Sequence, residues 1–143
     1  MTSKLIGNLT ELETMTDFVR LGYNILTPYG DCEPYDYVID TKKGFIRIQC
    51  KTAQTEDDGA SFSFGCRSNH RKGGKIVHHK YTKDEIDYFA THFQGVTYLI
   101  PVEECGATKR LRILPAKDNQ DRGVSWAKDY VLEEVVKTWE ADV

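Results

Sequence analysis

Asp36, Gln49 and Lys51 are the residues of this chain whose types and spacing suit a definite chemistry. A carboxylate can hold a hard cation such as Mg²⁺, and a lysine can manage the charge on a water molecule or a phosphate. Metal-assisted hydrolysis of a phosphodiester combines these two functions. The side chains must meet at one place, so the elements that carry them decide whether such a site can exist.

A predicted β-hairpin carries all three residues. Residues 34–40 and 45–51 are rich in β-branched and aromatic side chains, and a short polar segment ending in Gly44 separates them. A symmetric turn pairs residues whose numbers have the same sum. The expected pairs are Asp40 with Phe45, Val38 with Arg47, and Asp36 with Gln49.

The two faces of this hairpin differ in chemistry. Side chains alternate along a strand, so Lys51 is expected on the same face as Gln49, opposite Asp36. The other face carries Ile46, Ile48 and Cys50, which we expect to point into a core. A carboxylate, an amide and an ammonium therefore gather on the polar face.

An amphipathic helix is predicted from about Leu5 to Leu21, with Gly22 as its C-terminal stop. Its apolar residues at helical spacing are Leu5, Leu9, Leu12, Met15, Phe18 and Val19. At about 100° per residue, Glu11 lies at the margin of this apolar arc, whereas Glu13 and Asp17 lie on the opposite face, expected to be solvated. Glu11 is therefore the helix acid expected to face the sheet.

The hairpin resembles the signature of the PD-(D/E)XK nucleases: Pro34-Tyr35-Asp36, then Gln49-Cys50-Lys51, with Gln49 where most members carry an acid. The surrounding segments resemble one branch, the small group I intron-encoded homing endonucleases described mainly from cyanobacteria. The segments that carry this likeness are Glu11 on the first helix, Leu21–Tyr23, Pro28–Asp31, Gln49–Ala53, Tyr81–Ala90 and Tyr98–Pro101. The likeness extends from the first helix to about the last predicted strand.

This resemblance implies a single PD-(D/E)XK endonuclease domain over residues 1–143, of α/β class, with a restriction-endonuclease-like core and a mixed central sheet flanked by helices. It implies that Glu11, Asp36 and the main-chain carbonyl of Cys50 hold Mg²⁺, with Mn²⁺ able to substitute, while Lys51 orients the attacking water. Gln49 is neutral, so we expect weaker metal binding than at a site with three carboxylates.

The segment from Arg67 to Lys83 is basic and contains no acidic residue. Gly73-Gly74 lies at its centre without a clear period, which predicts a flexible loop or an irregular hairpin. Together with the alternating segment Ser61–Phe64, it provides the residues expected to contact double-stranded DNA: Ser61, Ser63, Arg67, Arg71, Lys72, Lys75, His78 and Lys80.

The remaining pattern completes the predicted α/β order. The expected strands are Tyr23–Thr27, Ser61–Phe64, Val96–Ile100 and Leu111–Leu114, and residues 116–123 are expected to form a loop. A capping-box pattern at Thr82–Glu85, followed by Ile86, Phe89, Ala90 and Phe93, predicts a second helix that ends at Gly95. Leu132, Val135, Val136 and Trp139 predict a closing amphipathic helix that packs on the domain or on a second subunit.

Length and composition limit the class of protein. The chain has 143 residues, 40% hydrophobic and 29% charged, which indicates one globular domain. It contains no apolar run long enough for a membrane span and no secretory signal, so we expect a cytoplasmic protein, associated with the nucleoid in a prokaryotic host. Its four cysteines form no C-x-x-C pair, although Cys66 with His70, His78 and His79 remains an alternative metal site.

Other functions share these residues. A Holliday-junction resolvase or a restriction enzyme would use the same catalytic set, and a catalytically silent DNA-binding module would fit the missing acid at Gln49. A His-metal nuclease built on His78-His79 is a further alternative. Because one such domain cuts one strand, we expect a homodimer or a dimer of dimers, that is, a homotetramer.

Overall fold

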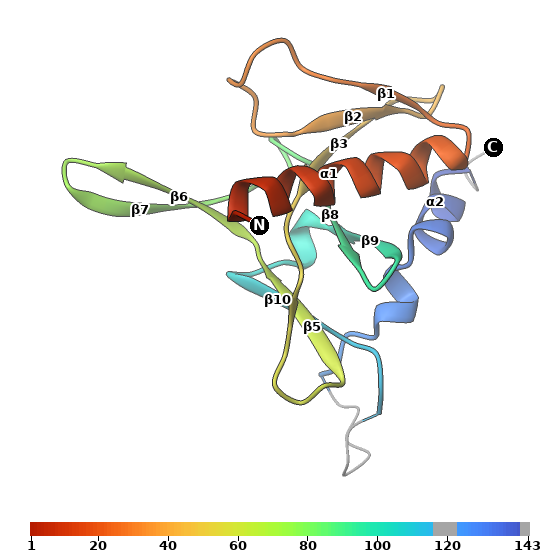
Figure 1. The fold of residues 1–143 in the computed structure, drawn as a ribbon. Coiled ribbons are helices and arrows are strands. Elements are labelled where there is room, and N and C mark those ends of the chain that lie inside the picture. Colours follow the sequence, from red (N-terminus) through yellow and green to blue (C-terminus); the bar gives the residue numbers. More distant parts are fainter. Residues whose placement is uncertain (116–122, 141–143) are drawn as a thin grey trace.

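A computed structural model describes residues 1–115 and 123–140 (Figure 1). Its centre is a five-stranded mixed sheet with the order β1-β2-β3-β8-β9, in which β3 and β8 are parallel and the other pairs antiparallel. The strands are β1 (Asn24–Leu26), β2 (Tyr37–Asp40), β3 (Phe45–Cys50), β8 (Tyr88–Phe93) and β9 (Val96–Pro101). The predicted α/β class with a mixed central sheet is confirmed.

The other elements cover this sheet or extend from it. The helices are α1 (Ser3–Arg20), α2 (Leu132–Glu140) and two 3₁₀ turns, η1 (Val102–Glu104) and η2 (Ala127–Tyr130). A small antiparallel sheet contains β10 (Thr108–Arg112), β5 (Ser61–Gly65) and β4 (Gln54–Thr55). The separate pair β6 (Arg67–Lys72) and β7 (Lys75–Lys80) projects away from the body (Figure 1).

Two hydrophobic cores lie on the two faces of the central sheet. Phe18 of α1 and Val136 of α2 pack with Tyr37 and Ile48 on one face. On the other face, residues such as Phe89 pack against the small sheet. The molecule therefore has three layers, with both helices on one side, and the central strands are covered on both faces.

The central hairpin has the register predicted from its turn. β2 and β3 pair Tyr37 with Ile48, Val38 with Arg47, Ile39 with Ile46 and Asp40 with Phe45. Asp36 directly precedes β2. Because Ile48 belongs to the core beneath the helices, its neighbour Gln49 points to the opposite face of β3.

Helix α1 forms where it was predicted, but of its predicted apolar face only Phe18 and Met15 pack into the core. The buried residues are Thr10, Thr14 and Phe18. The side chains of Leu5, Leu9, Leu12 and Val19 are instead 55%, 45%, 61% and 58% exposed. Hydrophobic periodicity predicts the wrong face because the polar side chains that face the sheet find hydrogen-bond partners there and can therefore be buried.

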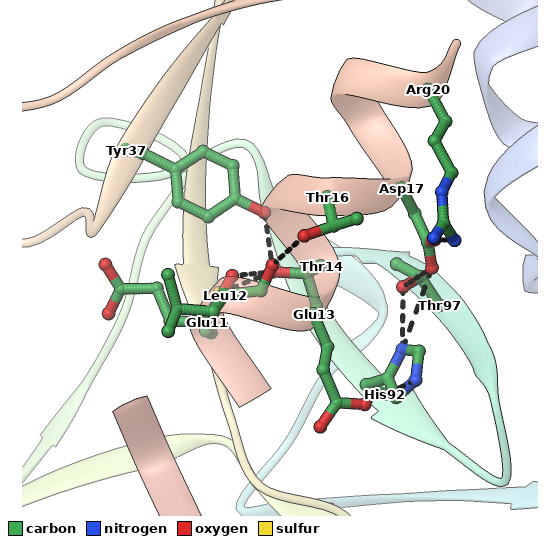
Figure 2. A network of polar contacts seen from close by, with 11 residues as sticks. Glu11, Leu12, Glu13, Thr14, Thr16, Asp17, Arg20, Tyr37, His92 and Thr97 are labelled. Carbon is green, nitrogen blue, oxygen red and sulfur yellow. Dashed lines mark hydrogen bonds and ion pairs between the residues drawn. The ribbon is translucent and has the colours of Figure 1, made fainter. Parts of the chain in front are cut away.

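Glu13 and Asp17, expected on the solvated side, are among these sheet-facing residues (Figure 2). Oε2 of Glu13 lies 2.6 Å from Nε2 of His92, and Oδ2 of Asp17 accepts a hydrogen bond of 2.6 Å from Thr97. His92 also lies 2.9 Å from Thr97, through Nδ1. This network fixes the C-terminal half of α1 over β8 and β9.

The predicted second helix is wrong. The capping pattern does form, because Thr82 N–H donates to the Glu85 carboxylate at 3.1 Å and Ile86 N–H donates to the Thr82 carbonyl at 3.1 Å. The turn then gives way to β8, which pairs with β3 on one side and β9 on the other. Both faces of this central strand are buried, so its apolar residues lack a clean alternation and imitate a helical period.

The remaining predictions on the order of elements are largely confirmed. Residues 23–27 contain β1, residues 96–100 lie in β9, and α2 closes the described chain by packing on the domain. The strand predicted at 111–114 lies earlier, in β10, and most of the loop predicted at 116–123 lies outside the described residues. In the described part of the chain, no helix is long and apolar enough to cross a membrane.

Candidate active site

Asp36 is held at the start of the hairpin by its neighbours across the pair. Its main-chain N–H donates to the Ile48 carbonyl at 2.8 Å, and its Oδ2 accepts a hydrogen bond of 2.7 Å from the N–H of Cys50. The carboxylate therefore sits beside the end of β3. This is the position that the predicted register requires.

Glu11 faces the same space as Asp36, as predicted from its place on the helix. Both residues line one cavity of about 340 Å³, together with Thr27, Pro28, Gly30, Asp31, Glu33 and Tyr35. Burial and the nearby charge of Asp36 raise the pKa of Glu11 above its ordinary value. Two side chains that lie 25 positions apart in sequence are thus brought within electrostatic reach of each other.

Lys51 extends from the end of β3 on the side of Asp36. Its Nζ donates a hydrogen bond of 3.1 Å to the Arg67 carbonyl and lies 5.3 Å from the centre of the Tyr81 ring. Burial lowers the pKa of Lys51, and the charge of Asp36 opposes this effect. Burial raises the pKa of Asp36, and the hydrogen bond from the Cys50 N–H and the charge of Lys51 oppose this increase. The Lys51 ammonium and the Asp36 carboxylate therefore each favour the charged form of the other.

Gln49 is the half-buried member of this group. It lies on β3 between Ile48 and Cys50, whose side chains pack in the core beneath the helices, and it pairs with Phe89 of β8. Alternation along β3 directs it to the face that carries Lys51. Gln49 is not among the residues that line the cavity of Glu11 and Asp36, so its part in a metal site stays a prediction.

Thr14 joins the three segments that carry the candidate residues, and the sequence analysis did not identify this role. Its Oγ1 accepts a 2.9 Å hydrogen bond from Tyr37 and donates a 2.9 Å bond to the Glu11 carbonyl (Figure 2). The same atom lies 3.3 Å from Sγ of Cys50. Glu11 and Cys50 are themselves candidate residues, and Tyr37 follows Asp36 directly. This buried hydroxyl therefore fixes α1 against β2 and β3. The signal in the sequence is a threonine one helical turn from Glu11 and one turn from Phe18.

The donor set of the cavity fits a hard cation. Glu11 and Asp36 offer carboxylate oxygens in one space, and the repulsion between them is the kind that a bound cation relieves. Among residues 1–115 and 123–140, no group of three His, Cys, Asp or Glu side chains is arranged to hold a metal. Carbonyl, amide, water and substrate oxygens must therefore complete the coordination of any Mg²⁺ bound here.

The alternative metal site at Cys66 and the histidines is not assembled. Cys66 is buried, whereas His70 and His78 are exposed on the projecting strands. His79 instead lies 2.8 Å from Oε2 of Glu85, and His78 lies 2.5 Å from Oδ1 of Asn69. These partners also leave the His78-His79 nuclease alternative without a metal-ligand cluster in the described part of the chain.

The residues predicted to contact DNA divide into two groups. Ser61 and Ser63 are 3% and 8% exposed, so the expectation that they face DNA is wrong. Ser61 is held by the Asp58 carboxylate at 3.0 Å and by Nε of Arg110 at 2.9 Å. The other six are distributed along β6 and β7, which form a regular hairpin and not a loop: Arg67, Arg71, Lys72, Lys75, His78 and Lys80.

Comparisons with known proteins identify the family and the fold of the chain. A family model described as PD-(D/E)XK endonuclease matches residues 1–133. Among solved structures, a bacterial homing endonuclease, I-Ssp6803I, has a similar fold with a TM-score of 0.78 and 17% sequence identity, over 99% of this chain and 98% of that chain. A search of curated proteins finds no match. At this identity the structural likeness concerns the fold.

Proposed function

Because the chain belongs to the PD-(D/E)XK endonuclease family, we propose that it is a Mg²⁺-dependent endonuclease that hydrolyses phosphodiester bonds at a specific site in double-stranded DNA. The observation that carries the proposal is the shared cavity of Glu11 and Asp36, with Lys51 beside Asp36. We further propose that residues 1–143 act as one endonuclease domain on DNA in the cytoplasm, in the nucleoid of a prokaryotic host.

Each residue of the site has a separate role in this proposal. Glu11, Asp36 and the Cys50 carbonyl hold the divalent cation, which when bound supplies positive charge beside the scissile phosphate. Lys51 holds the attacking water by a hydrogen bond and offsets the negative charge that grows on the phosphate oxygens. Gln49 contributes an oxygen without charge, so the chain offers less attraction for the cation than a site with three acids.

The specific role we propose is intron homing, and the full-length likeness to the fold of a bacterial homing endonuclease supports it. A homing enzyme cuts the intron-free form of one long target. A resolvase of the same family would prefer a four-way junction, and a restriction enzyme a short site protected by methylation. Cleavage assays on these three substrates separate the alternatives.

We also propose that the active enzyme contains at least two copies, as a homodimer or a dimer of dimers, because both strands must be cut. The outer face of α1 supports this. Leu5, Leu9, Leu12, Thr16 and Val19 recur at alternating spacings of four and three residues, the pattern of a helix-pairing seam. All exposed residues of α1 between Lys4 and Arg20 are uncharged, so two copies can meet there without repulsion.

A nicking assay tests the catalytic proposal. Wild type, Asp36→Ala, Lys51→Ala and Lys43→Ala, an exposed lysine in the hairpin turn, are compared on plasmids that carry flanking genomic DNA, with Mg²⁺ or with chelator. We expect the first two variants and the chelator each to lower the rate by at least about 100-fold. Lys43→Ala should cut like wild type. Equal cutting by all four proteins would contradict the mechanism, and sequence-selective binding without any cutting would indicate a silent DNA-binding module.

A further inference from the structure

The projecting pair β6–β7 is a regular two-stranded ribbon. Six residue pairs run from Arg67 with Lys80 to Lys72 with Lys75. Gly73 and Gly74 close it as a two-residue turn with φ of +59° and +78°, which is the left-handed geometry that glycine adopts without strain. At about 3.3 Å per residue the ribbon is roughly 20 Å long.

Alternation gives this ribbon two faces. One face, here called the recognition face, carries Arg67, Asn69, Arg71, Ile76, His78 and Lys80. The opposite face carries Ser68, His70, Lys72, Lys75, Val77 and His79. The two faces thus differ in which cations they present.

Burial shows which face is turned toward the body. Ser68 and His79, which pair with each other, are the two half-buried residues of the ribbon, and the other residues of the two strands are exposed. His79 lies 2.8 Å from Oε2 of Glu85 and packs edge-on against the Tyr81 ring, with centroids 5.3 Å apart. These contacts fix the base of the ribbon and leave the recognition face free.

The free face has the chemistry that reads base pairs. Arginine pairs bidentately with guanine and asparagine with adenine in the major groove, whose width admits a two-stranded ribbon. Nδ1 of His78 lies 2.5 Å from Oδ1 of Asn69, so the imidazole orients this amide from across the ribbon. Ile76, 58% exposed, offers an apolar contact of the kind that thymine methyl groups accept.

We propose that the recognition face enters the major groove and reads base edges through Asn69 and Arg71, while Lys72 and Lys75 at the tip contact phosphates. This inference rests on the proposed DNA-cleaving function and deepens it. A ribbon of this length spans about six base pairs at 3.4 Å each. The specificity of the protein should therefore depend on a contiguous block of base pairs.

The experiment uses sequence selection by binding, in chelator, so that it does not depend on cleavage. The full chain is incubated with a random duplex library, and the bound sequences are read for wild type, Asn69→Ala, Arg71→Ala and the matched control His70→Ala, which lies on the opposite face. We expect Asn69→Ala and Arg71→Ala each to lose a discrimination of roughly 5- to 150-fold at one or two neighbouring positions. His70→Ala should select the wild-type sequence.

The lysines at the tip give the complementary result. Lys72→Ala and Lys75→Ala should weaken binding to all duplex sequences by the same factor. On the selected duplex, each substitution should lower the slope of log affinity against log salt by about one. Equal loss of discrimination in Asn69→Ala and His70→Ala, or no selected sequence for wild type, would overturn the recognition face. If wild type selects a sequence but does not cut it with Mg²⁺, the proposed nuclease function fails and the recognition face stands. Thermal unfolding of each variant excludes loss of fold as the cause.

Discussion

The Nζ of Lys51 donates a hydrogen bond of 3.1 Å to the main-chain carbonyl of Arg67, the first residue of β6. The candidate catalytic lysine is thereby joined to the base of the β6–β7 ribbon, which we propose to bind DNA. Tyr81, which follows β7 directly, places its ring under the same ammonium. Both ends of the ribbon therefore contact the side chain that the proposed mechanism uses to hold water.

We expect Tyr81→Leu to lower the single-turnover cleavage rate by about 3- to 30-fold, because a cation–π contact contributes about 0.5–2 kcal/mol to the placement of the ammonium. Tyr81→Phe keeps the ring and should retain most of the rate. DNA affinity should stay near the wild-type value in both variants. If both variants lose the rate equally, Tyr81 acts through its hydroxyl or through packing and not through the ring face.

Gln49→Glu adds a charge on the face of β3 that carries Lys51, and we expect it to lower the Mg²⁺ concentration for half-maximal cleavage by about 10-fold, because hard cations prefer carboxylates. Gln49→Met, which has similar volume and no oxygen, should raise that concentration. Titration of the cleavage rate with Mg²⁺ measures both changes. A requirement that is the same in all three proteins would show that residue 49 does not face the cation.

Leu12→Glu places a charge at the most exposed apolar residue of the helix-pairing seam on α1. If two copies pair there, the buried area is on the order of 500 Å² per copy, near the lower limit of specific interfaces. We expect light scattering to show a shift from dimer to monomer, and plasmid assays to show nicks in place of double-strand breaks. Leu114→Glu, at an exposed leucine outside α1, is the control and should change neither result.

The acid dependence of stability should contain a contribution from Asp58. Its carboxylate accepts hydrogen bonds from Ala60 N–H, Ser61 and Arg110, which lower its pKa from 3.8 to about 2. A carboxyl group whose pKa is lower in the folded state than in the unfolded state stabilises the fold at pH values above its unfolded-state pKa. This stabilisation is lost as the pH falls through its folded-state pKa.

Asp58→Asn should therefore lower the melting temperature at pH 7, and the difference from wild type should disappear as the pH falls from about 4 to about 2. Thermal unfolding by circular dichroism across this range measures it, with Asp57→Asn, at the exposed neighbouring aspartate, as control. A constant difference at all pH values would mean that the charge of Asp58 has no part in the effect.

The sequence alone determined the central hairpin and the two carboxylates of the candidate site, Asp36 and Glu11. The register follows from a short turn ending in Gly44 and from alternation, both of which act within a few residues, so the placement of Asp36 beside the end of β3 could be predicted. The position of α1 also followed from local periodicity. Glu11 was found because it lies between the buried and exposed faces under either orientation of the helix.

Only the tertiary structure decided which polar groups are buried. Thr14, Glu13 and Asp17 face the sheet because Tyr37, His92 and Thr97 arrive from distant segments to satisfy them, and hydrophobic periodicity cannot register such partners. Residues 88–93 form a strand because β3 and β9 supply hydrogen bonds on both sides. Local patterns record the preference of each side chain for water, whereas the long-range pairing of backbone and polar groups sets the cost of burying it.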